Sequence, residues 1–180
     1  MNQETPSTHP NTVIKYCPFC GAKDLESRDV NYFYCNSCHK EYFTNTAAAV
    51  AAIITDNQGR ILFTRRAHDP FKGMLDLPGG FVDAGETAEE ALFREIREEL
   101  GSEIIEFSYF CSFPNEYPYS GLTYYTLDLA FICKLESMNN LKAMDDISGI
   151  EFIDPMQVSL DEISSQSMRN IIRTYRGHLI

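Results

Sequence analysis

A single stretch, Gly80 to Gly101, constrains this chain more than any other segment. Its sequence, GFVDAGETAEEALFREIREELG, predicts a helix with defined ends. Thr87 is a preferred N-cap residue, and Glu90, three positions later, completes the pattern of a capping box. Gly101 suits the left-handed conformation in which many helices end. We therefore expect one helix that begins after Thr87 and stops before Gly101.

The predicted helix carries three carboxylates on one face. At about 100° per residue, Glu95, Glu98 and Glu99 lie close together, beside an apolar stripe that can pack into a core. Arg94 precedes Glu98 by one turn and is placed to orient a carboxylate. Carboxylates this close repel one another unless a cation lies among them, and Mg²⁺ prefers oxygen ligands. A solvated acidic helix face is the alternative, and the triplet of glutamates alone does not exclude it.

The spacing of the segment is more specific than the helix. Gly80 is followed after five residues by Glu86, and after seven more by the run Arg-Glu-Ile-Arg-Glu-Glu-Leu-Gly. This arrangement resembles the signature box of the Nudix hydrolase family. It departs from the family pattern at the last position, where Ser102 replaces the usual aliphatic residue. That position concerns packing, so the departure does not affect the expected chemistry.

The resemblance implies a fold, an activity and a set of site residues. We expect an α/β fold, the Nudix α/β/α sandwich with a mixed sheet, and a hydrolase that uses Mg²⁺ or Mn²⁺. The implied ligands of the catalytic metal are Gly79, through its backbone carbonyl, and Glu95, Glu98 and Glu99. Glu98 is the implied general base, with Arg94 fixing its position. Asp146 is a candidate for a further outer carboxylate.

Four cysteines near the start of the chain form a second constellation. Cys17 and Cys20 make one C-x-x-C pair and Cys35 and Cys38 another, with fourteen residues between the pairs. This spacing is typical of a structural, tetrahedral zinc site in a small zinc ribbon. Disulfides are the alternative, which we disfavour because the first residues show no apolar signal core. Four cysteines already complete the site, so we expect His39 to be a surface residue.

These features divide the chain into a flexible tail at residues 1–14, a zinc ribbon at 15–45 and a Nudix hydrolase domain at 46–180.

The formal net charge of −11 disfavours nonspecific binding to nucleic acid or to an anionic membrane. Acidic and basic side chains cancel within the ribbon, so we expect it to be structural or to support a homodimer rather than to bind nucleic acid. The longest apolar run, Ala47 to Ile54, is too short to cross a bilayer, and we expect a cytoplasmic protein.

Apolar runs and turn residues predict the remaining elements. We expect a hairpin with strands at 47–55 and 60–65, further strands at 104–110, 124–135 and 146–154, and an amphipathic helix at 165–176. The strand at 124–135 should be central, because it is long and rich in apolar residues. Cys111 and Cys133 are single thiols in apolar surroundings and are expected to fill the core.

A run downstream of the box points to substrate recognition. Residues 112–120 read SFPNEYPYS, which partly resembles an array that NADH pyrophosphatases of the Nudix family carry at this offset. The matching residues are Ser112, Pro114, Tyr117, Pro118 and Ser120. The tryptophan of that array is missing here, which weakens the case for a reduced nicotinamide substrate. We expect a loop whose aromatic rings stack on a purine or similar ring; a hydrophobic loop under the sheet is the alternative.

Two classes of function fit these observations. The first is a metal-dependent pyrophosphohydrolase that cleaves a nucleoside diphosphate linked to a further group, such as NAD(H), ADP-ribose or FAD, and releases a nucleoside monophosphate. The second is a non-catalytic, Nudix-like ligand sensor whose ribbon recruits a protein or nucleic acid. A sensor has no need for Arg94, Glu95, Glu98 and Glu99, so the sequence favours the enzyme, with a small dinucleotide as its partner.

Overall fold

The computed structural model describes residues 7–180, which fold into two compact units. Among the described residues, the N-terminal unit contains residues 7–46 and also residues 116–125. The core unit contains residues 47–115 and 126–180. Residues 116–125 therefore belong with a part of the chain from which they are far removed in sequence.

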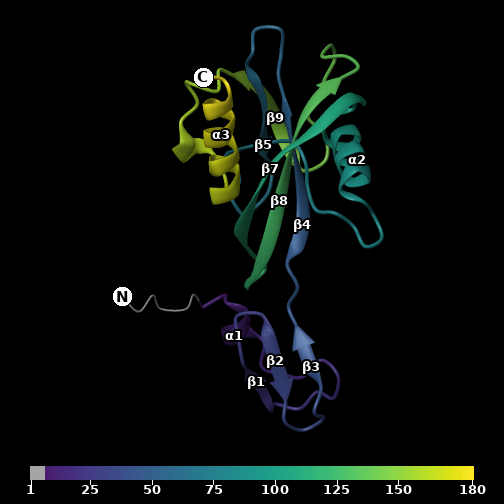
Figure 1. Ribbon diagram of the computed structural model, residues 1–180, viewed down its shortest axis with the longest axis vertical. Helices are drawn as coiled ribbons and strands as arrows, with labels where there is room; N and C mark the ends of the chain where they lie inside the picture. The colour runs from purple at the N-terminus through teal and green to yellow at the C-terminus, as the bar shows by residue number, and fades with distance from the viewer. Residues whose placement is uncertain (1–6) are drawn as a thin grey trace. The chain divides into compact units, whose positions relative to one another are not determined.

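The N-terminal unit contains one short helix and a small antiparallel sheet (Figure 1). Its elements are α1 (Pro10–Val13), β1 (Leu25–Ser27), β2 (Tyr32–Cys35) and β3 (Glu41–Phe43), with β2 between β1 and β3. The flexible tail predicted at residues 1–14 falls partly outside the described residues, and within the described part α1 begins at Pro10. The side chain of His9 caps this helix by accepting the backbone N–H of Asn11.

The core unit contains two three-stranded sheets and two long helices. The strands are β4 (Ala47–Ile54), β5 (Ile61–Arg66), β6 (Leu75–Asp76), β7 (Ile104–Tyr119), β8 (Leu122–Leu135) and β9 (Ile147–Ile153), and the helices are α2 (Ala88–Leu100), η1 (Leu160–Glu162, a short 3₁₀ helix) and α3 (Gln166–His178). The last residues of β7 and the first of β8, within 116–125, belong to the N-terminal unit. One sheet has the order β4-β8-β7, with β4 parallel to β8. The other has the order β6-β5-β9, in which β5 is antiparallel to both neighbours. As predicted, β8 is the central strand of its sheet.

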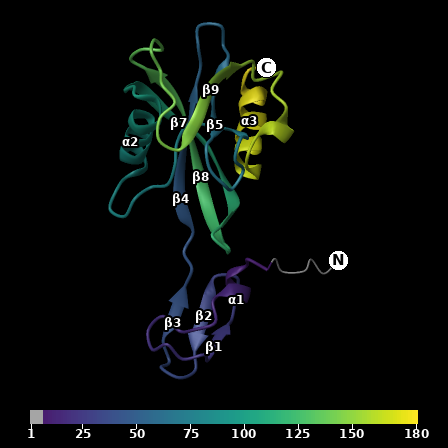
Figure 2. The ribbon, with the colours of Figure 1, turned by 180° about the vertical axis from the view of Figure 1, so that it is seen from behind.

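The helices α2 and α3 cover opposite sides of these strands (Figures 1 and 2). Alternate residues of β4 serve the two layers. Val50, Ala52 and Ile54 pack with the apolar stripe of α2, whereas Ala51 and Ile53 pack with that of α3. A strand covered on both faces must be apolar at every position, which explains the continuous apolar run of β4. The predicted α/β/α sandwich is confirmed.

Two local predictions are wrong. The strands expected to pair as a hairpin, β4 and β5, share only the bridge between Thr55 and Ile61 and then enter different sheets. The substrate loop expected at residues 112–120 is instead the second half of β7. Pro114 and Pro118 are tolerated there because β7 lies at the edge of its sheet, where one side of the strand needs no donors. Among the described residues, no helix is long and apolar enough to cross a membrane.

Candidate functional site

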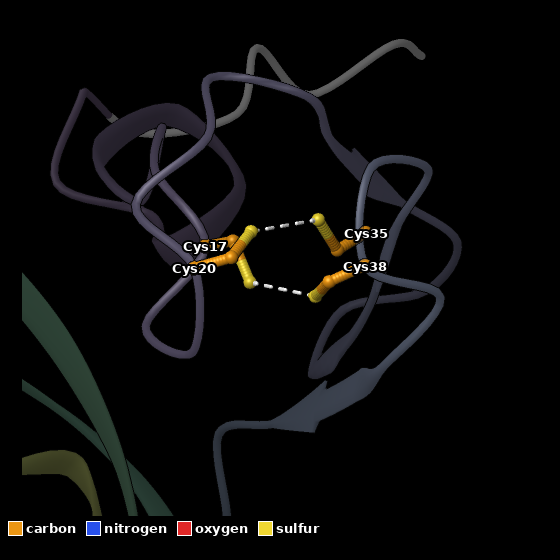
Figure 3. A group of neighbouring side chains, drawn as sticks. All are labelled: Cys17, Cys20, Cys35 and Cys38. Atoms are coloured by element: carbon orange, nitrogen blue, oxygen red, sulfur yellow. Dashed lines mark hydrogen bonds between the residues drawn. The ribbon is translucent and has the colours of Figure 1, made fainter.

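The four cysteines of the predicted ribbon converge on one point (Figure 3). Their sulfur atoms all lie within 4.8 Å of one another. The closest contacts join opposite pairs, with 3.7 Å between the sulfurs of Cys17 and Cys38 and 3.7 Å between those of Cys20 and Cys35. Ligands about 2.3 Å from a tetrahedral zinc ion lie about 3.8 Å apart, whereas a disulfide needs about 2.05 Å. The cluster therefore has the geometry of a zinc ribbon and not of two disulfides.

Electrostatics within the cluster also favour a bound cation. Burial opposes ionisation of Cys17, but the backbone N–H groups of Phe19 and Cys20 and the neighbouring thiols lower its pKa to about 7. The backbone N–H of Lys40 favours the Cys38 thiolate, yet burial and the other three cysteines raise the pKa of Cys38 to about 12. Four thiolates cannot coexist here without a positive charge among them. As expected, His39 stays outside the cluster and is exposed.

The helix α2 has the ends that its sequence predicts. The hydroxyl of Thr87 accepts the N–H of Glu90, and the Glu90 carboxylate accepts the N–H of Thr87, which completes the capping box. At the other end, Gly101 adopts the left-handed conformation with φ 63°. These caps set the rotational phase of the helix and therefore the direction in which each glutamate points.

Glu99 is the most unusual carboxylate of the helix. Only 6% of it is exposed, and it accepts one hydrogen bond, of 2.9 Å, from the backbone N–H of Gly79. Burial raises the pKa of Glu99 well above its usual value, and the neighbouring carboxylates of Glu95, Asp76 and Asp146 raise it further. No cation pairs with Glu99 among the described residues. A desolvated carboxylate in an acidic environment is a chemical match for a divalent metal ion.

The glycine pair before the helix lies very close to β4 and α2. Gly79 has φ 140°, and a Cβ there would collide with the carbonyl of Val50. A Cβ at Gly80 would collide with the carboxylate of Glu95, so both glycines are required by close approach. The carbonyls of Pro78 and Gly80 accept hydrogen bonds of 2.8 Å from β4. No hydrogen bond among the described residues ends on the Gly79 carbonyl, the metal ligand that the family resemblance implies.

Arg94 organises the carboxylates around it. Its guanidinium makes two hydrogen bonds of 3.0 Å to Glu86, one of 2.7 Å to Glu95 and one of 3.1 Å to Glu98. It also donates to the carbonyl of Phe81 at 2.9 Å. The expected contact between Arg94 and Glu98 is therefore present, and Glu98, with 47% of its side chain exposed, can meet solvent while held in place.

The strongest partner of Arg94 is a residue to which the sequence assigned no role. Both carboxylate oxygens of Glu86 accept hydrogen bonds from Arg94, and this contact holds the pKa of Glu86 below its usual value. Such a bidentate pair fixes the plane of the guanidinium as well as its position. The signal that could have identified Glu86 is its place in the spacing of the box, eight residues before Arg94.

Two aspartates lie near the buried glutamate. Asp146 raises the pKa of Glu99, yet 77% of its own side chain is exposed, so it is an outer carboxylate at most. Asp76, which the sequence did not single out, is held by Arg66 at 3.1 Å and by the hydroxyl of Ser164 at 2.9 Å. Burial raises the pKa of Asp76 despite these partners. Only the tertiary structure brings Asp76 toward Glu99, since it lies on β6.

The predicted substrate residues do not form a single group. Ser112 and Pro114 belong to the core unit, whereas Tyr117, Pro118 and Ser120 belong to the N-terminal unit. The hydroxyl of Tyr109 donates to that of Ser112 at 3.2 Å.

The two single cysteines lie in apolar surroundings, as the sequence predicts. Cys133 is buried in the α2 layer, and Cys111 is half-buried in the α3 layer.

The family model of the NUDIX domain matches residues 45–175. This chain belongs to the NUDIX family. An ADP-ribose pyrophosphatase of Methanocaldococcus jannaschii is 38% identical over 114 residues, which cover 62% of this chain and 64% of that protein. The NAD-capped RNA hydrolase NudC of Vibrio vulnificus is 27% identical over 128 residues, which cover 71% of this chain and 48% of that protein. The chain thus spans less than two thirds of the length of both relatives.

Solved structures support the same fold. The crystal structure of a NUDIX hydrolase from Nitrosomonas europaea superimposes with a TM-score of 0.66 and is 19% identical, covering 92% of this chain and 93% of the other. Membership of the NUDIX family agrees with the box in the sequence and with the observed ends of α2.

Proposed function

We propose that this protein is a metal-dependent pyrophosphohydrolase that cleaves the diphosphate of a nucleoside diphosphate linked to a further group. The observation that carries this proposal is Glu99, a buried carboxylate with a raised pKa and no cationic partner among the described residues. A helix that merely faced solvent would have no reason to bury an unpaired carboxylate, because its desolvation costs free energy. The names of the relatives from M. jannaschii and V. vulnificus point to the same class of diphosphate substrate.

The residues present fit a Mg²⁺ or Mn²⁺ site. Glu99, Glu95 and the Gly79 carbonyl would hold the ion, and Glu98 is available as a further ligand. The donor set consists of oxygens only, as these hard cations require. The bound ion supplies charge neutralisation and orientation of the diphosphate. Arg94 is committed to Glu86, Glu95 and Glu98 and therefore acts by holding the carboxylates apart and in register.

Glu98 is the proposed general base. It is the most exposed of the three glutamates, and Arg94 fixes one of its oxygens at 3.1 Å. Glu98 accepts a proton from a water molecule as the water oxygen bonds to one phosphorus. The bond from that phosphorus to the bridging oxygen then breaks, so that a nucleoside monophosphate and a second phosphate monoester leave.

We extend the proposal to substrate recognition and to the ribbon. ADP-ribose, NAD(H) and FAD share a nucleoside diphosphate, and the rings of Tyr117 and its neighbours on β7 provide flat surfaces for a base. The other proposed contact residues are Ser112 and Pro114 in the core unit, and Pro118 and Ser120 in the N-terminal unit. Zinc held by the four cysteines is structural, since a closed set of four thiolates leaves no open position for a substrate.

The proposal is tested by a panel of substrates with Mg²⁺ and with Mn²⁺. ADP-ribose, NAD⁺, NADH, FAD and a short RNA with a 5′ NAD cap are assayed by mass spectrometry for monophosphate products. Glu99→Gln should lower kcat by roughly 10² or more, the scale of losing one strong electrostatic stabiliser. Glu89→Gln is the matched control, because Glu89 is exposed on the first turn of the same helix. Wild-type turnover by folded Glu99→Gln protein would refute the metal-hydrolase function.

The same panel distinguishes the hydrolase from the sensor alternative. A ligand sensor would bind one of these compounds and release it unchanged, and it would give the Glu86–Arg94–Glu98 arrangement no role. Tight binding of ADP-ribose without any product, with either metal, would favour the sensor.

A further inference from the structure

The N-terminal unit joins two stretches that are far apart in the sequence. One is the segment before α1, and the other is the tip of the β7–β8 hairpin, residues 116–125, which we call the hairpin tip. The backbone N–H of Thr123 donates to the carbonyl of Thr8 at 2.7 Å, and the hydroxyls of the same two residues are 2.9 Å apart. The ring of His9 meets that of Tyr125 edge-on, with 6.1 Å between centroids. Two neighbouring residues thus hold the hairpin tip by three contacts.

The same segment is attached to the ribbon. The Nδ1 atom of His9 accepts the backbone N–H of Asn11 at 3.1 Å and so starts α1. The side-chain amide of Asn11 donates to the carbonyl of Asp29 at 3.3 Å, in the turn between β1 and β2. Pro10, between them, is buried. A continuous series of contacts therefore runs from the ribbon through α1 to the hairpin tip.

The hairpin tip carries three of the five residues to which we assign substrate contact: Tyr117, Pro118 and Ser120. The ring of Tyr117 stacks on that of Tyr119, with 6.2 Å between centroids and 26° between planes. An isolated two-stranded hairpin is marginally stable in water. The pairing of β4 with β8 starts at Thr126, so the hairpin tip consists of β7 and β8 alone, and contacts with the rest of the N-terminal unit contribute to the order of these rings.

We propose that Thr8 and His9 are positioning residues through which the ribbon holds the hairpin tip in its substrate-binding conformation. The ribbon is then part of the recognition apparatus as well as a structural module. This inference rests on the proposed function for its effect on catalysis, but the contact itself is independent of any activity.

The threonine pair offers a sensitive way to test the contact. Thr123 is 7% exposed, and its hydroxyl has Thr8 as its hydrogen-bond partner. Thr8→Val keeps the shape of the side chain but leaves the Thr123 hydroxyl buried without a partner. Replacing both residues by valine removes both polar groups together and is expected to be nearly neutral. Thr12→Val is the matched control, because Thr12 lies in α1 with its side chain exposed.

The measurement is amide hydrogen exchange of the zinc-loaded, full-length protein. In Thr8→Val, exchange across residues 116–125 should be about five to ten times faster, the factor that corresponds to a lost buried hydrogen bond. His9→Ala should act in the same direction. Thr8→Val/Thr123→Val should return toward the wild-type rates, and Thr12→Val should match the wild type. Equal rates in Thr8→Val and Thr12→Val would overturn the proposal.

Kinetics then test the link to recognition. KM for the preferred substrate should rise by about the same five- to tenfold factor in Thr8→Val, with kcat unchanged, as lost uniform binding produces. Faster exchange with an unchanged KM would overturn the recognition role and leave the proposed hydrolase intact. A protein inactive on the whole panel would refute the hydrolase, while the exchange rates alone would still decide whether the ribbon holds the hairpin tip.

Discussion

The cysteine cluster and the carboxylates of α2 are the two cation sites that we propose, and they are built in opposite ways. The four cysteine sulfurs lie within 4.8 Å of one another, and no other set of three or more metal-binding side chains among residues 7–180 is gathered so tightly. The glutamates are instead spread around Arg94, with Glu99 buried and Glu98 half-exposed. The first site is complete, and the second leaves positions open.

This difference fits the functions that we propose for the two sites. A structural metal site contributes folding free energy, so all four ligands come from the chain and exclude other ligands. A catalytic site must admit a diphosphate and a water molecule, so protein ligands fill only part of the coordination shell. Arg94 supports the open arrangement, because it keeps the carboxylates in place when no cation is bound.

The largest effect is expected from a substitution that disrupts the four-cysteine cluster and leaves the carboxylates of α2 unchanged. Cys35→Ser should abolish zinc binding and unfold the ribbon, because structural zinc contributes on the order of 10 kcal/mol to such modules. The core unit should stay folded, so exchange of the α2 amides should not change, whereas residues 15–45 and the hairpin tip should exchange faster. Zinc content and hydrogen exchange are the measurements. Cys111→Ser is the control, since Cys111 lies outside the cluster. Stoichiometric zinc in Cys35→Ser protein would contradict this prediction.

A second, smaller effect is expected from the contact of Glu86 with Arg94, which orients the carboxylates of α2. Glu86→Gln removes the charge that grips Arg94, so the guanidinium should shift toward Glu95 and Glu98. We expect kcat to fall by about 10-fold to 100-fold, the usual range for residues that orient metal ligands, with the fold intact. Glu103→Gln is a matched control, because Glu103 makes a similar pair with Arg97, at 2.7 and 2.9 Å, on the exposed side of α2. Equal losses in both variants would show that Glu86 acts only through general electrostatics.

The smallest expected effect concerns the pH dependence of stability that is due to a buried carboxylate outside both proposed sites. Asp128 of β8 is 3% exposed and accepts hydrogen bonds from the hydroxyls of Thr126 and Ser167. Burial raises the pKa of Asp128, although these two hydroxyls lower it in part. Because the folded state holds this proton more tightly than the unfolded state, the contribution of Asp128 to stability is full below its unfolded pKa and is lost as pH rises through its folded pKa.

Asp128→Asn should therefore gain stability relative to the wild type as pH rises from about 4 toward neutrality, with about 3.9 as the unfolded pKa. Thermal unfolding of both proteins across this range is the measurement, and the difference between them cancels the other carboxylates. A constant difference at all pH values would mean that the Asp128 carboxyl has an ordinary pKa in the folded protein.

Features that depend on local spacing could be predicted from the sequence. The ends of α2 follow from Thr87, Glu90 and Gly101, and the shared face of its glutamates follows from the helical period. The cysteine quartet follows from two C-x-x-C turns, each of which brings its own pair of sulfurs together. The two helix-covered faces of β4 follow from its unbroken apolar run.

Features that need residues far apart in the chain depend on tertiary packing and could not be predicted from the sequence. Tertiary packing buried Glu99 rather than Glu98 and placed the backbone N–H of Gly79 against it, since burial depends on what lies opposite a helix. It made residues 112–119 an edge strand, where prolines are tolerated, instead of a loop. It also joined the hairpin tip to Thr8, a contact across 115 positions for which no local pattern exists. Local periodicity selects the elements and their faces, whereas the partner of each face is set by the packing of the whole chain.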